Sequence, residues 1–120
     1  MKGNQSKIEA IIKDLRFVIK HTEKIKVIED LNKEEILLDC ILFRIIQISE
    51  NANKITNEFK VENDSIPWGE IKGLRNRVVH DYGNVNLLII FRVIKIYLPR
   101  LLESFEKLIE FDSIDKSYQK

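Results

Sequence analysis

Apolar residues recur at intervals of three and four along most of the chain, which is the spacing of one face of an α-helix. The first such stretch follows Ser6, which forms a capping-box pattern with Glu9 and so marks a helix start. Its apolar positions are Ile8, Ile11, Ile12, Leu15, Val18 and Ile19. The pattern predicts a first helix from Ser6 to about His21, followed at residues 22–30 by either a short helix or a structured loop.

The second stretch predicts the longest helix. Asn32, with Glu35 three residues later, is another helix-start signal. The apolar stripe after it comprises Leu37, Ile41, Ile45, Ile48, Ala52, Ile55 and Phe59. A helix of about 28 residues would be ~42 Å long at 1.5 Å per residue. Because further leucine and isoleucine residues widen the apolar face, we expect one side to pack on the core and another to be available to a partner.

Two prolines and an asparagine organise the second half of the chain. Pro67 suits the first position of a helix, because its missing N–H needs no partner there. The apolar residues that follow predict a helix from about Pro67 to near His80, and they are Trp68, Ile71, Leu74 and Val78. Asn86 can cap the next helix. Pro99 must kink or restart that helix, because it removes a backbone hydrogen bond, and the pattern then continues to about Phe111.

The whole pattern predicts one helical domain. No stretch alternates apolar and polar residues as a half-buried strand would. We therefore expect an all-α fold, an antiparallel bundle of four to five helices in a single domain over residues 1–120, with an ordered core over about residues 6–111.

Composition narrows the class of protein. With 44% hydrophobic and 32% charged residues, the chain is typical of a globular protein. No signal peptide or membrane-spanning run is recognised, so we expect a cytoplasmic protein without a membrane partner. The net charge of +1 gives no general attraction to nucleic acid, and any RNA contact must use a local patch. The single Cys40 excludes an intramolecular disulfide, and its apolar surroundings predict a buried thiol.

One segment stands out by its chemistry. Arg75, Asn76, Arg77, His80 and Tyr82 fall within eight residues beside a predicted helix end. At about 100° per residue, Asn76 and His80 would share a helix face, whereas Arg75 and His80 would lie about 140° apart. Arg75 and His80 can therefore converge only if His80 leaves the helix or if a second copy of the chain completes the pocket.

These groups suit cleavage of a phosphodiester without a metal or cofactor. An imidazole moves protons near neutral pH, and a guanidinium neutralises charge on a phosphate. RNA carries its own nucleophile, the 2′-hydroxyl. His80 would then act as a general acid or base, and Arg75 would hold the phosphate through two parallel hydrogen bonds, with Asn76 and Arg77 in supporting or RNA-contacting roles.

The segment resembles the HEPN superfamily and, within it, the HepT-like toxins, whose signature is R-x-x-x-x-H-x-Y. Arg75, His80 and Tyr82 match that signature position by position. Further likeness is found in Ile66-Pro67-Trp68, Gly73-Leu74-Arg75-Asn76-Arg77, Val85-Asn86-Leu87, Leu98-Pro99 and Ile48-Ser49-Glu50, the last with a serine where the family usually has glycine. The resemblance covers roughly residues 8–109.

The resemblance implies a homodimer in which the motifs of two subunits line one composite cleft. It implies an endoribonuclease toxin whose substrate is RNA, and an antitoxin that is a minimal nucleotidyltransferase. That partner would transfer AMP to the motif tyrosine, here Tyr82, and so place negative charge and bulk where substrate phosphate must bind. The alternative is a non-catalytic HEPN partner of a nucleotidyltransferase, which would hold nucleotide or RNA while the partner performs the chemistry.

Structural roles remain open for several of these residues. Arg75 and Arg77 could pair with Glu70 or Asp81 on a solvated face. Trp68 is in phase with the apolar residues after it, which favours a core anchor over a platform for stacking bases. His21 has no signature around it and is expected at the surface.

Overall fold

The structure is a computed structural model that describes the backbone at residues 2–81 and 84–118, and the surroundings of side chains at residues 3–78 and 86–109. Its helices are α1 (Lys2–His21), α2 (Ile28–Asn32), α3 (Glu35–Asn53), α4 (Asn57–Glu62), α5 (Trp68–Val78), α6 (Leu87–Arg92), the π-helical η1 (Val93–Tyr97) and α7 (Leu98–Tyr118). Two short strands, β1 (Val79–Asp81) and β2 (Asn84–Val85), pair at one end. The predicted all-α class is confirmed.

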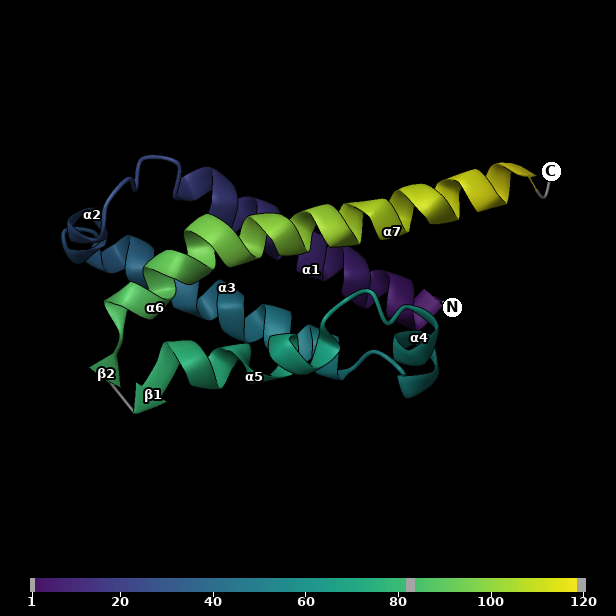
Figure 1. Ribbon diagram of the computed structural model, residues 1–120, viewed down its shortest axis with the longest axis horizontal. Coiled ribbons are helices and arrows are strands. Elements are labelled where there is room, and N and C mark those ends of the chain that lie inside the picture. Colours follow the sequence, from purple (N-terminus) through teal and green to yellow (C-terminus); the bar gives the residue numbers. More distant parts are fainter. Residues whose placement is uncertain (1, 82–83, 119–120) are drawn as a thin grey trace.

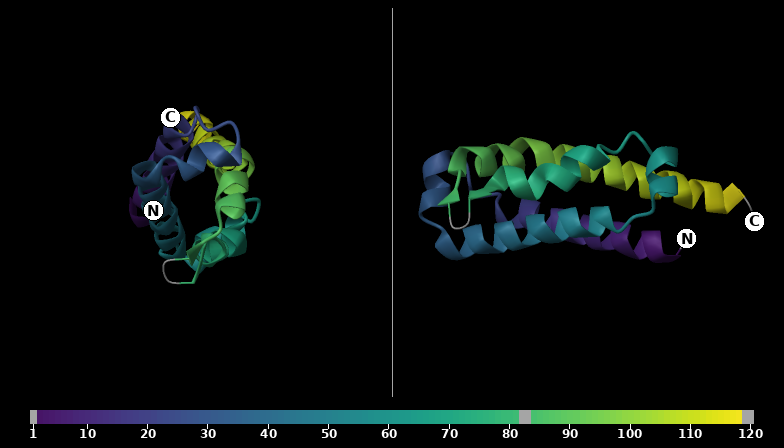
Figure 2. Two further views of the ribbon diagram at one scale, coloured as in Figure 1. Left: turned by 90° about the vertical axis from the view of Figure 1, so that its left-hand side faces the viewer. Right: turned by 90° about the horizontal axis from the view of Figure 1, so that it is seen from below.

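The long helices form an elongated antiparallel bundle that measures 52 × 27 × 20 Å. Helix α3 packs against α1 on one side and α5 on the other, and α1 also packs against α7. α1 begins and α7 ends at the same end of the bundle, whereas α2 and the β1–β2 pair lie at the opposite end (Figures 1 and 2). Every long helix contributes fully buried side chains to one core, among them Leu15, Ile45, Leu74 and Phe105. None of the helices in the described ranges is long and apolar enough to span a membrane.

The start of α1 differs from the prediction. The helix begins at Lys2, so Ser6 lies inside it and is not its N-cap. The additional turn is held by Asn4, which is buried although it is polar. Its side-chain amide donates to Thr56 Oγ1 at 3.0 Å, and its carbonyl oxygen accepts from the Thr56 backbone N–H at 3.2 Å. A contact across 52 residues of sequence cannot be read from the local capping pattern.

The predicted long helix is in fact two. Helix α3 ends at Asn53 and α4 starts at Asn57, capped by the Thr56 side chain, which accepts from the Phe59 backbone N–H at 3.3 Å. At its other end, α3 is preceded by Glu34, because Asn32 belongs to the last turn of α2. The apolar stripe continues across the break because residues on both sides of it pack on the same core.

The segment left open between the first two helices contains a turn and then α2. Asp30 organises this turn, because its carboxylate accepts from the backbone N–H of Lys26 at 2.8 Å and of Val27 at 3.1 Å. These two hydrogen bonds lower the pKa of Asp30, since they favour the charged carboxylate.

The signals at proline and asparagine in the second half are confirmed. Helix α5 starts at Trp68, directly after Pro67, and Asn86 caps α6 by accepting from the backbone N–H of Leu88 and Ile89. Before Pro99 the chain widens into η1, which accommodates the hydrogen bond that proline cannot make, and then continues as α7.

The aromatic ring of Trp68 is part of the packing. It makes edge-to-face contacts with Phe59 and Phe105, at centroid distances of 6.3 and 5.8 Å. Its indole N–H donates to the Asn63 carbonyl at 3.0 Å. Trp68 is therefore a core anchor, as its phase predicts.

Helix α3 has a second apolar face, which is exposed. Cys40 was expected to be buried, but its thiol is exposed, and it lies between Ile36, 82% exposed, and Phe43, 58% exposed. These three residues are four and three positions apart and so form one stripe on the helix. The sequence correctly predicted a wide apolar face, but the prediction that Cys40 lies in its buried part was wrong.

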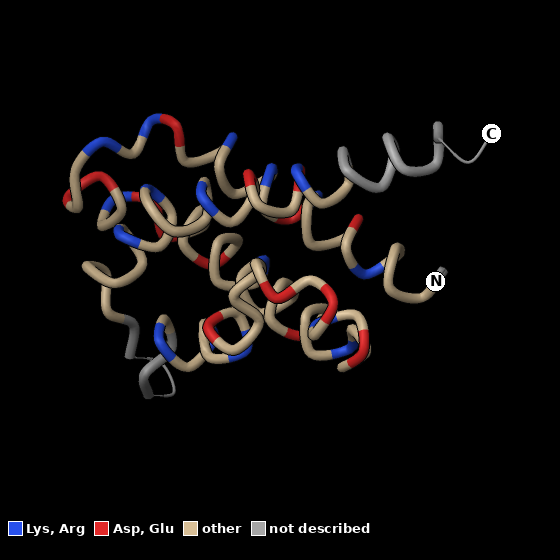
Figure 3. The backbone as a smooth tube through the Cα atoms, turned by 45° about the vertical axis from the view of Figure 1, so that its right-hand side comes forward, with Lys and Arg blue, Asp and Glu red and all other residues tan. Residues whose placement is uncertain are grey.

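Charged residues of both signs are interspersed along the tube in Figure 3. This distribution agrees with the net charge of +1, so that any attraction to an anionic ligand must be local.

Candidate functional site

The last turn of α5 and the strand after it carry the residues singled out in the sequence. Helix α5 ends at Val78, so His80 lies beyond the helix and the helical relation between Asn76 and His80 does not apply. One of the two conditions for bringing Arg75 and His80 together is thereby met at the level of the backbone. The side chain of His80 and the whole of Tyr82 lie outside the described residues.

The strand that contains His80 is irregular. In the antiparallel pair, Val79 lies opposite Val85 and Asp81 lies opposite Asn84, so β1 has one more residue than β2 between these pairs. The additional residue is His80. A bulge of this kind bends a strand, and bulges are common beside active sites.

Arg75 and Asn76 line an open pocket of about 550 Å³ between α3 and α5. We call it the α3–α5 pocket, and its lining residues are Ser49, Glu50, Asn53, Gly69, Lys72, Gly73, Arg75 and Asn76. The structure therefore brings Arg75 and Asn76 together with a second cation, Lys72, and with three polar residues of α3.

Ser49 joins the two helices that form this pocket. Its side chain is buried, and its hydroxyl donates to the Ile71 carbonyl oxygen at 2.9 Å. This hydrogen bond joins the C-terminal part of α3 to α5 one turn before Arg75. The serine that stands in place of the usual glycine thus adds an interhelical contact, and the next residue, Glu50, lies at the pocket.

Two glycines keep the pocket open on the α5 side. Gly69 and Gly73 are one helical turn apart, and a Cβ atom added at either position would meet no heavy atom within 4 Å. The space above them is therefore unfilled by the protein.

Arg77 lies away from this pocket, because it is about 200° around the helix from Arg75. Its charge instead acts on Tyr97, whose hydroxyl donates to Glu70 Oε2 at 3.4 Å. Burial, and after it the nearby Glu70 carboxylate, raises the pKa of Tyr97 to about 12, whereas Arg77 acts in the opposite direction. Of the three polar residues near the end of α5, only Arg75 and Asn76 line the pocket.

Lys72 and Asn53 were not singled out in the sequence, although each has a local signal. Lys72 is four residues before Asn76, and Asn53 is three residues after Glu50, so each shares a helix face with a residue of the motif or of the family-like pattern. What the sequence could not show is that the two faces oppose each other across one pocket. In the part of the chain with described side chains, no three His, Cys, Asp or Glu residues gather as a metal site would require.

Comparisons with known proteins point to one family. Residues 8–108 match the family described as "Ribonuclease HepT-like". A protein of Caldanaerobacter subterraneus subsp. tengcongensis named "Putative RNase TTE0752" is 27% identical over 110 residues, which cover 92% of this chain and 97% of the relative. "Probable ribonuclease HepT" of Thermococcus cleftensis is 30% identical over 95 residues, which cover 72% and 86% of the two chains. No solved structure matches the chain significantly.

Proposed function

Since this chain belongs to the HepT-like ribonuclease family, we propose that it is a metal-independent endoribonuclease in which Arg75 and His80 act on the scissile phosphate. One observation carries the proposal. Arg75 is exposed on the last turn of α5 and lines an open pocket, and the chain then leaves the helix at a bulged strand that contains His80. An exposed guanidinium beside an open pocket is suited to an anionic ligand.

The reaction uses groups that this chain and RNA supply. The 2′-oxygen forms a bond to phosphorus while the bond from phosphorus to the 5′-oxygen breaks, which leaves a 2′,3′-cyclic phosphate and a free 5′-hydroxyl. His80 takes the proton of the 2′-hydroxyl or gives one to the departing 5′-oxygen. Arg75 stabilises the charge that grows on the other phosphate oxygens. Asn76 holds the neighbouring phosphate or sugar, and Arg77 contacts RNA outside the pocket.

We place a second copy of the chain on the exposed stripe of α3. Ile36 and Phe43 are seven residues apart, and Glu50 follows after seven more, so the stripe leads along one face of α3 to the α3–α5 pocket. Covering apolar side chains that are otherwise in water favours association. A homodimer formed there brings two motifs towards one composite cleft, in which each subunit contributes an imidazole.

The proposed dimer can be tested directly by measuring the oligomeric state of variants by sedimentation. Phe43→Asp is expected to give a monomer, whereas Val61→Asp, a control at an apolar residue that is 76% exposed on α4, leaves the dimer intact. A Phe43→Asp protein that still sediments as a dimer would place the interface elsewhere.

We further propose that the protein is a toxin and that a partner nucleotidyltransferase neutralises it at Tyr82, two residues after His80. The phenolic oxygen attacks the α-phosphorus of ATP, the α–β phosphoanhydride bond breaks, pyrophosphate leaves, and the phenol proton passes to a base. The added phosphate is negative and competes with RNA for the cations of the site.

The experiment is induced expression of the wild type and of His80→Ala, with growth and total RNA followed in cells and RNA cleavage by the purified proteins followed with EDTA present. We expect only the wild type to arrest growth and to produce cyclic phosphate ends, and we expect EDTA to have no effect. Co-expression of the nucleotidyltransferase should restore growth and add the mass of AMP to the peptide that contains Tyr82. If wild type and variant are equally harmless and cut no RNA, the non-catalytic alternative replaces this proposal.

A further inference from the structure

We propose that the α3–α5 pocket is a nucleotide subsite, which holds the RNA nucleotide next to the cleaved one, with Lys72 on its phosphate. The inference rests on the proposed ribonuclease function and adds residues to it that the motif does not contain. The proposal gives a binding position for the part of the RNA strand next to the scissile phosphate.

The pocket is continuous with the motif, because Arg75 and Asn76 belong to both. Lys72 is three residues before Arg75 on the same helix, and residues at this spacing have Cβ atoms about 5–6 Å apart. Two cations at this separation can contact neighbouring phosphates of a single strand. A strand whose scissile phosphate is held by Arg75 thus extends naturally towards Lys72.

The pocket also has room for the rest of a nucleotide. Its volume of about 550 Å³ falls within the range of roughly 300–1,000 Å³ that is usual for ligand sites. The floor on the α5 side is formed by Gly69 and Gly73, where even a methyl group would be in open space. A sugar or base can therefore approach the α5 backbone closely.

The two helices offer different chemistry, which gives the nucleotide an orientation. Helix α5 contributes the cations Lys72 and Arg75, whereas α3 contributes Glu50 and Asn53. A carboxylate repels phosphate but accepts hydrogen bonds from hydroxyl and amino groups. The phosphates therefore follow α5, and the 2′-hydroxyl or an amino edge of the base faces Glu50. A 2′-hydroxyl contact is also what separates RNA from DNA.

The test measures binding in the full-length His80→Ala protein, so that cleavage does not interfere. The probe is a fluorescent single-stranded RNA, titrated at several salt concentrations. Removing one phosphate contact lowers the slope of log K against log salt by about 0.7 for a single strand. We expect this change for Lys72→Ala and not for Lys20→Ala, which removes the same charge from the exposed face of α1.

A second pair of variants tests the shape of the pocket. Leucine favours a helix more than glycine does, so Gly73→Leu should fold at least as stably as the wild type while its side chain fills the pocket. We expect RNA affinity to fall tenfold or more. Gly3→Leu is the control, because Gly3 is also helical and open but lies in the first turn of α1. Glu50→Ala should narrow the difference in affinity between RNA and DNA of the same sequence.

The outcomes separate the two proposals. If Lys72→Ala and Gly73→Leu bind RNA like their controls while the wild type still cleaves, the subsite is wrong and the ribonuclease stands. If the wild type cleaves nothing but both variants lose RNA affinity, the pocket binds RNA and the catalytic proposal fails. A third outcome is that AMP displaces the RNA probe and binds as tightly as the RNA does, and that Lys72→Ala and Gly73→Leu no longer bind AMP. The pocket would then be a site for free nucleotide, and the subsite proposal would be overturned.

Discussion

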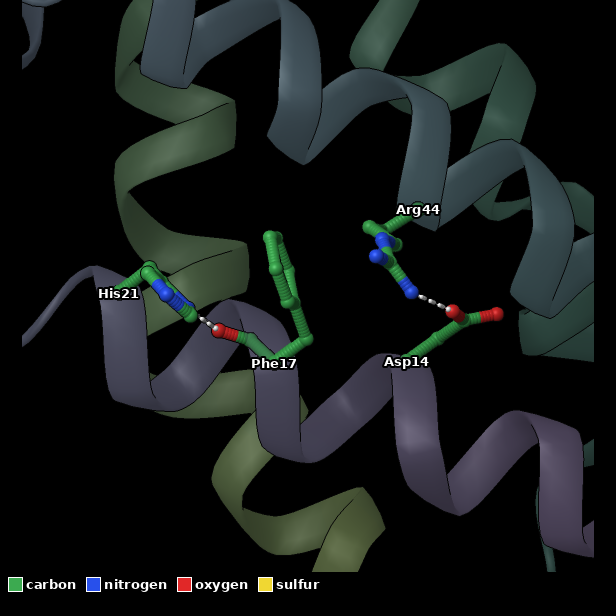
Figure 4. A network of polar contacts seen from close by, with 4 residues as sticks. All are labelled: Asp14, Phe17, His21 and Arg44. Atoms are coloured by element: carbon green, nitrogen blue, oxygen red, sulfur yellow. Dashed lines mark hydrogen bonds and ion pairs between the residues drawn. The ribbon is translucent and has the colours of Figure 1, made fainter.

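Two arginines, Arg44 of α3 and Arg75 of α5, have very different surroundings. Arg44 lies between α3 and α1, where its Nη1 is 2.7 Å from Asp14 Oδ1 and its guanidinium carbon is 3.9 Å from the centre of the Phe17 ring. His21 stacks on the other side of that ring and donates from Nδ1 to the Phe17 carbonyl (Figure 4). Arg75, on the α5 side, is exposed and lines the open α3–α5 pocket.

The comparison shows how a structural arginine differs from one that is available to a ligand. The hydrogen-bonding edge of Arg44 is occupied by a carboxylate that is only 11% exposed, and its flat face is covered by an aromatic ring. Both recognition surfaces of the guanidinium are thus used inside the protein. Arg75 is exposed and lines a pocket, so its replacement should change RNA cleavage and leave the fold intact.

The largest expected effect is that of Arg75→Ala on RNA cleavage. Loss of one preorganised donor to transition-state charge typically lowers kcat by about 10²–10³. Because Arg75 is exposed, the free energy of unfolding should change by no more than ~0.5 kcal/mol. Single-turnover cleavage and urea denaturation of the same preparation measure the two quantities.

Arg75→Lys keeps the charge but not the planar fork, and it should recover only a small part of the rate. Full activity in Arg75→Ala, or a large loss of stability, would remove the distinction between the two arginines.

The next effect is on stability and belongs to Arg44→Ala. The substitution leaves the Asp14 carboxylate without its cation in a nearly buried place, and it uncovers Phe17. Hydrogen bonds to charged groups contribute roughly 1.5–3 kcal/mol, so we expect a loss of about 2–3 kcal/mol in the free energy of unfolding. Urea denaturation measures it.

Cleavage well below the unfolding transition should remain near the wild-type rate in Arg44→Ala. Asp14→Asn is the companion variant, since it keeps the shape of the carboxylate and removes its charge. If Arg44→Ala abolishes cleavage in a folded protein, Arg44 is not merely structural.

Much of the fold was predictable because its signals are local. Helix α5 starts after Pro67, Asn86 caps α6, and the chain changes its helical form before Pro99, in each case because one residue alters the backbone hydrogen bonds of its own neighbourhood. The errors were at Ser6, Asn32 and the end of α3. At the first of these, a distant contact decides the boundary, the one between Asn4 and Thr56.

The candidate site was predictable only in part, for the same reason. Arg75, Asn76 and His80 form a cluster in the sequence, and the motif names them. The α3–α5 pocket instead depends on which face of α3 meets α5, and that is decided by contacts between residues far apart in the sequence, among them the bond from Ser49 to the Ile71 carbonyl. Cys40 shows the same limit, since a wide apolar face does not reveal which part of it is covered.

A smaller effect on the free energy of unfolding is expected for Ser49→Ala. This variant tests the contact of α3 with α5, the helix that carries Arg75. The variant loses the 2.9 Å hydrogen bond to the Ile71 carbonyl. That oxygen belongs to helix α5 and keeps its helical partner, so the cost should be about 0.5–1.5 kcal/mol. Thermal or urea unfolding measures it.

Because Ser49 holds α3 against α5, we also expect Ser49→Ala to raise the KM for RNA more than it lowers kcat. A change in stability with an unaltered KM would mean that the pocket keeps its shape without the serine.

The smallest effect is expected for Arg77→Ala. This variant tests whether Arg77 is a structural arginine like Arg44 or a ligand-binding arginine like Arg75. Removing one exposed charge near the site should weaken RNA binding only a few-fold, far less than Arg75→Ala changes cleavage. Its second effect is on Tyr97. Since Arg77 lowers the pKa of that phenol against burial and Glu70, its removal should raise the pKa of Tyr97 further.

The near-ultraviolet absorbance of the phenolate, measured as a difference from Tyr97→Phe, reports that titration. A group whose pKa is raised on folding contributes stability below its unfolded pKa and loses it as pH rises through the folded one. The contribution of Tyr97 should therefore disappear between about pH 10 and 12, and at higher pH still in Arg77→Ala. Arg77→Ala could instead leave the titration of Tyr97 unchanged and lose as much cleavage as Arg75→Ala does. Arg77 would then belong to the active site with Arg75, and its proposed effect on Tyr97 would be wrong.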